Sequence, residues 1–159
     1  MILKYYEAAK IDLDKNKFIL FYGKNEGLKN EEILKIIKKN HEYEKLKYDE
    51  KEILENLDNF FNILLSQSLF GERKIIIINR STDKFLKIIN EIIDREIRDV
   101  SIIFNADMLD KKSKLRSLFE KEKKFICIPF YPDTNETLSK LTYNFLKKKN
   151  ILISSETIN

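Results

Sequence analysis

The sequence predicts an α/β domain of three layers, in which helices cover both faces of a parallel sheet of about five strands. Two observations lead to this prediction. Short runs such as residues 18–22 and 75–78 are apolar throughout, which indicates strands that are buried on both faces. These runs alternate along the chain with longer amphipathic segments of helical period, as in parallel βαβ units.

The expected strands and helices follow one another in strict alternation. Strands are expected at residues 18–22, 43–48, 74–79, 101–104 and 125–128, and all of them except 43–48 are built on short apolar runs. The helices carry an apolar stripe at helical spacing: residues 30–40, 52–67, 83–95, 111–120 and 135–149. The strand at 43–48 is the weakest of the five. The chain shows no internal repeat and no low-complexity linker.

Individual residues predict where several of these elements begin and end. The first strand stops at Gly23, and a loop is expected over residues 23–29. Asn30 would cap the helix that follows. Asp107 and Asp110 follow the fourth strand, a place where α/β proteins often bind ligands. Asp110 is better explained as the N-cap of the next helix.

Composition limits the class of protein. The chain has 159 residues, 43% apolar and 35% charged, which suits one globular domain. A net charge of +4 is too small an excess to argue for a nucleic-acid partner. The single cysteine, Cys127, excludes a disulfide within the chain and lies in an apolar run, so a buried side chain is expected. No apolar run approaches the roughly 18 residues that cross a bilayer, and the chain opens without a signal peptide, so a cytoplasmic protein without membrane contact is expected.

The C-terminus predicts a second domain. Ser154 or Ser155 followed by Glu156 has the pattern of a capped helix start, yet no helix follows in the sequence. We therefore expect one domain over residues 1–150 and the start of a truncated second domain over residues 151–159.

Two large apolar residues, Leu69 and Phe70, stand side by side where the second helix is expected to end at Gly71. A helix buries one stripe, so adjacent residues cannot both face the same core well. An exposed Leu-Phe corner would suit a hydrophobic pocket on another protein. The alternative is a contact that locks the helix end onto the sheet, and local physics alone favours that alternative.

The loop after the first strand has the position of a phosphate-binding loop. Such a loop reads G-x-x-x-x-G-K-[ST], because backbone N–H groups cradle phosphate, the lysine neutralises it and the hydroxyl holds magnesium. Here Gly27 follows Gly23 one residue too early. Leu28 stands before Lys29, and Asn30 replaces the hydroxyl residue. The sequence therefore predicts the topology of a nucleotide-binding protein without its chemistry.

Other polar residues give no support for catalysis. Glu26 would place negative charge in the phosphate cradle, and the strand at 74–79 ends in Asn79 where an acidic residue should hold magnesium. His41, the single histidine, lacks partners at the spacing of a triad or metal cluster, so a solvated loop residue is expected. We expect no catalytic residue, no metal and no cofactor.

Two basic clusters, at residues 111–116 and 147–149, raise the alternative of nucleic-acid binding. Neither is interleaved with exposed aromatic residues that could stack on bases. The second lies in the last turn of a helix, where cations complement the helix dipole. Solvated faces are the better interpretation of both.

Three stretches resemble a known family. Residues 18–27 (FILFYGKNEG), 66–78 (SQSLFGERKIIII) and 105–118 (NADMLDKKSKLRSL) resemble, in order and spacing, the N-terminal domain of the delta subunit of bacterial DNA polymerase III. The block at 68–73 is the most specific part. The resemblance implies an AAA+-like fold of the P-loop NTPase class, in which the nucleotide motifs have decayed.

The resemblance also implies a role in DNA replication. The delta subunit is a non-hydrolysing part of the clamp loader in a nucleotidyltransferase holoenzyme, and it binds the ring-shaped sliding clamp (beta subunit) and opens one ring interface. In the family a Leu-Phe pair at a helix tip enters a pocket of the clamp; that pair corresponds to Leu69 and Phe70, with Gln67 and Ser68 leading into it. Other loader subunits would bind through later domains, and DNA only indirectly or weakly. The alternatives are a degenerate P-loop nucleotide-binding protein and a nucleic-acid-binding module.

Overall fold

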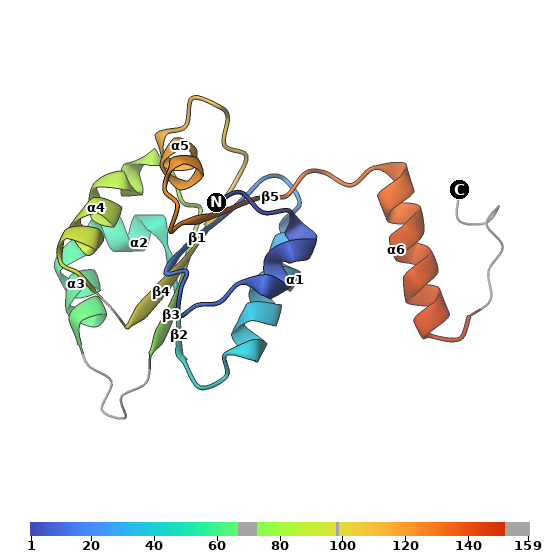
Figure 1. Cartoon of the computed structure of the whole chain (residues 1–159), viewed down its shortest axis with the longest axis horizontal. Helices are drawn as coiled ribbons and strands as arrows, with labels where there is room; N and C mark the ends of the chain where they lie inside the picture. The colour runs from blue at the N-terminus through green and yellow to red at the C-terminus, as the bar shows by residue number, and fades with distance from the viewer. Residues whose placement is uncertain (67–72, 98, 152–159) are drawn as a thin grey trace.

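The computed structural model describes residues 1–66, 73–97 and 99–151, and Figure 1 shows helices on both sides of a central sheet. The strands are β1 (Phe18–Tyr22), β2 (Glu44–Asp49), β3 (Lys74–Asn79), β4 (Val100–Ala106) and β5 (Ile126–Pro129). The α-helices are α1 (Glu26–Lys39), α2 (Glu50–Glu55), α3 (Leu57–Leu65), α4 (Leu86–Asp94), α5 (Lys114–Lys121) and α6 (Asn135–Lys148). Two short 3-10 helices are η1 (Tyr5–Lys10) and η2 (Asp83–Phe85).

The five strands form one parallel sheet in the order β2-β3-β4-β1-β5. Residues of β1 pair with both neighbours; Ile19, for example, lies opposite Ile103 of β4 and Ile126 of β5. The strands β1, β3 and β4 are buried along almost their whole length, whereas the edge strand β2 is partly exposed. The prediction of a five-stranded parallel sheet is confirmed.

Alternate residues of the strands supply two separate hydrophobic cores. Leu20 and Phe104 belong to the core beneath α2, α3, α4 and α5. Ile19 and Phe21 belong to the core on the opposite face, beneath α1 and η1. Because successive side chains of a strand point to opposite faces, a fully apolar strand requires cover on both sides. The three expected layers are therefore present.

The first helix begins earlier than the sequence predicts. Asn25, and not Asn30, is its N-cap: Asn25 Oδ1 accepts a hydrogen bond from the N–H of Leu28 at 3.1 Å. Most of the expected loop at 23–29 is therefore helical, and Gly27 lies in the first turn. Glycine is unfavourable inside a helix by about 1 kcal/mol, so Gly27 weakens this first turn. The asparagine cap offsets it.

The single helix expected over 52–67 is two helices. Asn56 leaves the helical conformation, with φ −145° and ψ 66°, and its side chain accepts a hydrogen bond from the N–H of Asn59. Asparagine side chains compete in this way with the helical ladder. The single helix expected over 83–95 is likewise two elements, the 3-10 helix η2 followed directly by α4.

The prediction that Asp110 caps the helix expected over residues 111–120, which is α5 in the structure, is wrong. Asp110 Oδ1 accepts from the N–H groups of Lys112 and Ser113 in a separate turn, and Ser113 is the N-cap. Asp83, distant in sequence, completes the helix start by accepting from the N–H groups of Lys114 and Leu115. Burial works to raise the pKa of Asp83, but these hydrogen bonds outweigh it and hold that pKa below its usual value.

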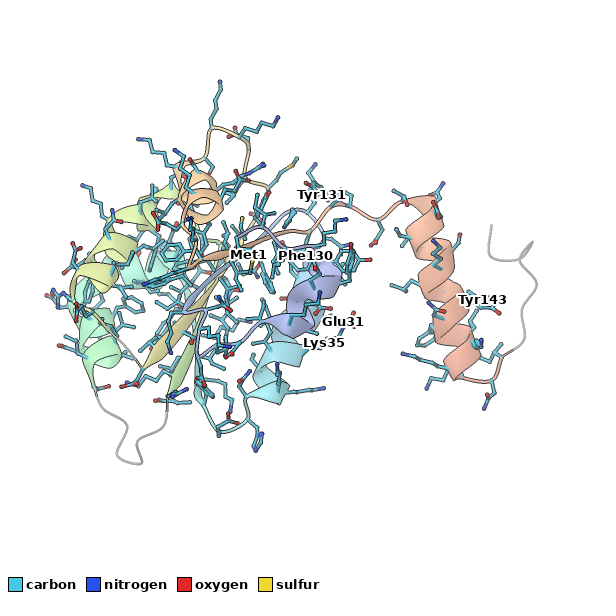
Figure 2. All side chains as sticks on the ribbon, in the orientation of Figure 1. Met1, Glu31, Lys35, Phe130, Tyr131 and Tyr143 are labelled. Atoms are coloured by element: carbon cyan, nitrogen blue, oxygen red, sulfur yellow. The ribbon has the colours of Figure 1, made fainter. Side chains whose placement is uncertain are left out.

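Helix α6 differs from the others because none of its residues is buried. Thr134 caps it in a box with Thr137. Figure 1 shows α6 apart from the sheet, and in Figure 2 Tyr143 lies on this helix while Phe130 lies beside α1. Its apolar residues Leu141 and Phe145 are more than half exposed. The expected second domain at 151–159 falls almost entirely outside the described residues.

Candidate functional site

The predicted clamp-binding residues lie outside the described part of the chain: Gln67, Ser68, Leu69 and Phe70, together with the predicted helix stop Gly71. The structure does describe both flanks of this segment. On the first flank α3 ends at Leu65, and Ser66 closes the helix. The N–H of Ser66 donates to the Asn62 carbonyl at 2.8 Å, and its hydroxyl donates to the Ile63 carbonyl at 2.9 Å.

Lys74 joins the two flanks. It is the first residue of β3, only 4% exposed, and its Nζ donates to the Ile63 carbonyl at 2.6 Å. The same Nζ donates to the Ser66 hydroxyl at 2.8 Å and to the Ser66 carbonyl. Carbonyls at a helix C-terminus have no intrahelical partners, and the helix dipole favours a cation there. Lys74 therefore holds the end of α3 against the start of β3.

Arg73 ties the second flank to the N-terminal part of the chain. Its Nη1 donates to the Tyr43 hydroxyl at 3.1 Å and forms an ion pair with Asp14, and the guanidinium lies 6.0 Å from the centre of the Tyr43 ring. The Arg73 carbonyl accepts from the N–H of Glu44 at 2.8 Å. The segment at 67–72 thus connects two ends that are each held by several hydrogen bonds.

The degenerate nucleotide loop lies at the opposite edge of the sheet, where the strands end. Gly23 has φ +126°, and a Cβ built on it would lie 2.1 Å from the Phe130 carbonyl oxygen. Its N–H donates to the Asp107 carbonyl at 3.2 Å. The first glycine of the motif is therefore needed for a close contact between the loop and the chain after β5.

Lys29, the lysine of the decayed motif, is fully buried. Its Nζ donates to the Ala106 carbonyl at 2.6 Å and pairs with Glu26 Oε1 at 2.5 Å, while the Glu26 side chain is 53% exposed. A phosphate-binding lysine must present its charge to the ligand. Here the Glu26 carboxylate, from the same helix, pairs with the Lys29 ammonium group instead.

Amide side chains occupy the place where a magnesium-binding acid would stand. Asn105 Nδ2 donates to Asn79 Oδ1 at 3.1 Å, and Asn79 Nδ2 donates to the Tyr48 carbonyl at 3.3 Å. Arg80 forms an ion pair with Asp49. A polar cavity of about 400 Å³ is lined by Asn79, Asn105, Arg80 and Asp49 together with Glu26, Asn30, Lys47 and Asp107. Across the described residues no group of three or more His, Cys, Asp or Glu side chains could hold a metal ion.

Two further candidates behave as ordinary structural residues. His41 is highly exposed in a loop, as predicted. Arg116, from the first basic cluster, donates to Glu120 at 2.7 Å and to the Leu109 carbonyl at 3.2 Å, and its guanidinium lies 5.1 Å from the centre of the Tyr22 ring. Its hydrogen bonds serve the fold, whereas Lys111, Lys112 and Lys114 of the same cluster are exposed.

Cys127 is fully buried, as the sequence predicts. Burial raises the pKa of its thiol to about 12. Because the thiolate is the nucleophilic form of cysteine, this residue is unsuited to nucleophilic chemistry.

The role of Lys74 was missed by sequence reasoning, although one weak signal for it exists: a lysine at the head of a strand that is otherwise purely apolar. Buried ammonium groups require several acceptors, and such a lysine predicts that carbonyls converge on it. The burial of Lys29 had no comparable signal, because a lysine in the first turns of a helix is usually solvated.

The family of the chain is shown by its sequence. Residues 19–129 match the model of the family described as DNA polymerase III, delta subunit. The chain belongs to this family. The match includes β1, the decayed loop, the segment at 67–72 and both of its flanks. Members of the family are accessory components of DNA polymerase III. No curated protein matches the chain in sequence.

Solved structures agree with this fold. A Bacillus subtilis DNA clamp loader delta protein is similar with a TM-score of 0.61 and 17% identity, over 97% of this chain and 49% of the other. Domain III of the Thermotoga maritima replication initiation protein DnaA is similar with a TM-score of 0.51 and 12% identity, over 98% and 72%. The chain spans about half the length of the delta protein. The expected AAA+-like α/β fold is confirmed.

Among the described residues, no helix combines the length and the apolar character that crossing a bilayer requires.

We predict opposite effects for the two glycines of this delta-family loop. Gly23→Ala should lower the free energy of unfolding by more than about 1 kcal/mol, because the new Cβ would meet the Phe130 carbonyl at a positive φ. Gly27→Ala should raise it by up to about 1 kcal/mol, because Gly27 lies in α1 and a Cβ there would make only an ordinary contact, with Asn25 Oδ1 at 3.9 Å. Urea denaturation would measure both, and equal effects would contradict this account.

We also predict that Lys74→Met destabilises the protein by about 1–3 kcal/mol, since the Ile63 and Ser66 carbonyls lose their buried donor. Lys47→Met is the matched control, because Lys47 is an exposed lysine of the neighbouring strand β2. Thermal unfolding followed by circular dichroism would compare them. A cost for Lys74→Met no greater than for the control would show that Lys74 does not hold the helix end.

Proposed function

We propose that the chain is the clamp-binding part of a delta subunit of the DNA polymerase III clamp loader, and that it helps to open the sliding clamp for loading onto DNA. The observation that carries the proposal is the family match over residues 19–129, which includes the Leu69-Phe70 block. The anchored flanks of residues 67–72 support it, because a plug that pushes on a partner needs a rigid base. The structurally similar Bacillus subtilis protein is itself a DNA clamp loader delta protein.

In this proposal Leu69 and Phe70 enter a hydrophobic pocket of the clamp, with Gln67 and Ser68 leading into the contact. A large apolar pair at the centre of an interface supplies most of the binding energy of such contacts. Opening a ring requires more than tight binding. The chain must bind the open or strained ring more tightly than the closed one, because a ligand shifts an equilibrium only through differential affinity.

We propose that the chain itself does not hydrolyse ATP, needs no cofactor, and acts beside related subunits that use ATP. The ion pair of Lys29 with Glu26 supports this, because the charge that would meet a phosphate is already neutralised. The paired amides of Asn79 and Asn105 support it as well, since they replace a carboxylate that would hold magnesium.

Residues 1–150 would form the clamp-binding domain, and residues 151–159 would begin a second domain that leads to contacts with other loader subunits. DNA would be contacted indirectly or weakly. A replication factor of this kind would act in the cytoplasm.

The central test compares two double variants against the cognate clamp. Leu69→Ala/Phe70→Ala should weaken binding roughly 100-fold or more, because each anchor is worth on the order of 2–4 kcal/mol. The matched control is Leu141→Ala/Phe145→Ala, which removes the same two residue types from exposed positions on α6. Surface plasmon resonance with immobilised clamp would give both affinities. Unchanged affinity of a folded Leu69→Ala/Phe70→Ala variant would remove the proposed function.

Calorimetric titration with ATP and magnesium separates this proposal from that of a nucleotide-binding protein. We expect no saturable binding at micromolar ATP, because Lys29 is buried and paired with Glu26. Magnesium-dependent binding in that range, lost in Lys29→Met, would favour the P-loop alternative.

A further inference from the structure

A groove of about 560 Å³ lies at the edge of the sheet where the strands begin. It is bounded by the starts of β1 and β5 and by the C-terminal ends of α4 and α5. Its lining consists of apolar side chains and charged side chains: Lys15, Lys17, Phe18, Ile92, Ile93, Glu96, Ile97, Lys121, Glu122, Lys123, Lys124 and Phe125. None of these residues belongs to the decayed nucleotide loop or to the two basic clusters at 111–116 and 147–149.

Apolar side chains form part of the lining. The rings of Phe18 and Phe125 pack against each other with their centres 4.8 Å apart. Ile93, on the last turn of α4, is 42% exposed, and Ile97 is partly buried beside it. An exposed isoleucine in a concave apolar surface is well suited to contact an apolar side chain of another molecule.

The charged part of the lining is strongly biased towards lysine. Five lysines and two glutamates line the groove. Lys15 pairs with Asp12 at 3.5 Å. By contrast, the side chains of Lys17, Lys121, Lys123 and Lys124 form no ion pair or hydrogen bond with any described residue. Their charges are therefore available to a ligand, and charge complementarity favours an acidic one.

The groove lies at the same edge of the sheet, and on the same face, as the C-terminal end of α3, which precedes the segment at residues 67–72. In a parallel sheet the connecting helices run opposite to the strands, so α3, α4 and α5 all end at the edge where the next strand begins. These three helices pack over the same core. Residues 67–72 connect α3 to β3, and the groove lies at the ends of α4 and α5. A protein that contacts the C-terminal end of α3 would lie on the side of the molecule where the groove opens.

We infer that this groove is a second contact for the partner proposed above, and that it receives an acidic segment carrying an apolar side chain. The inference rests on the proposed function for the identity of the partner. The apolar side chain would contact Ile93 and Ile97, and carboxylates would meet Lys121, Lys123 and Lys124.

A protein segment fits the groove better than a nucleic acid does. Single strands bind through aromatic faces on which bases stack. Here Phe125 is 6% exposed and the partly buried Phe18 ring packs against it, which leaves little aromatic surface for stacking. The exposed apolar surface is aliphatic and lies within a lysine rim, which matches an acidic peptide with an apolar side chain.

The test uses the 159-residue chain and the intact clamp. Lys121→Glu/Lys123→Glu/Lys124→Glu should weaken clamp binding roughly tenfold at low salt and slow association, with a smaller effect at high salt. Ile93→Glu should also weaken binding, because it places a carboxylate where the apolar side chain is received. The control is Lys147→Glu/Lys148→Glu/Lys149→Glu, the same charge change on exposed lysines at the end of α6, which should leave affinity unchanged.

Leu69→Ala/Phe70→Ala, measured in parallel, separates the two proposals. Loss of binding in that variant, with full binding by the lysine and Ile93 variants, would overturn the groove contact and leave the proposed function intact. Full binding by all variants would overturn both. A lysine variant that loses affinity for a single-stranded oligonucleotide but not for the clamp would assign the groove to nucleic acid and overturn the inference. Circular dichroism would verify that each variant is folded.

Discussion

The central strands β1, β3 and β4 are buried on both faces, and this burial determines where the helices must lie. A strand without a polar face needs cover on both sides, so the connecting helices form two layers. Because all strands are parallel, every connection between successive strands returns the chain to the same edge of the sheet. One edge therefore collects the strand ends and the decayed nucleotide loop. The other edge collects the helix ends, both flanks of the segment at 67–72 and the lysine-rimmed groove.

Two buried lysines have comparable roles at the two edges. Lys29 directs its ammonium to the Ala106 carbonyl and to Glu26, which neutralises the charge that a nucleotide would need. Lys74 directs its ammonium to carbonyls at the end of α3, which fixes the base of the proposed plug. A buried ammonium is stable only when acceptors surround it, so each lysine also organises its neighbourhood. Where the strands end, the charge of Lys29 is neutralised by Glu26. Where the helices end, several lysines that line the groove pair with no described residue.

Sequence reasoning succeeded where a single strong signal decides the outcome. Apolar runs such as residues 75–78 predicted the strands because an apolar run has few places in a soluble protein other than the core. Reasoning failed at helix boundaries, where signals compete: Asn25 displaced Asn30 as a cap, and Asn56 divided one expected helix into two. It also failed at Asp110, because the cap of α5 is completed by Asp83 from a distant part of the chain. For the candidate site, the residues themselves and the family resemblance supplied Leu69 and Phe70, which remain predictions.

The alternation of strands and helices and the loss of the phosphate-binding pattern were determined by the sequence alone, because each is carried by residues that lie near one another in the chain. The family was also determined by the sequence, through a match that extends over residues 19–129. Tertiary structure decided that Lys29 is buried, that Lys74 bonds the end of α3, and that lysines from two distant segments surround one apolar groove. These outcomes depend on which helix ends and strand starts meet in space. That proximity follows from packing across the sheet, and local sequence patterns carry no record of it.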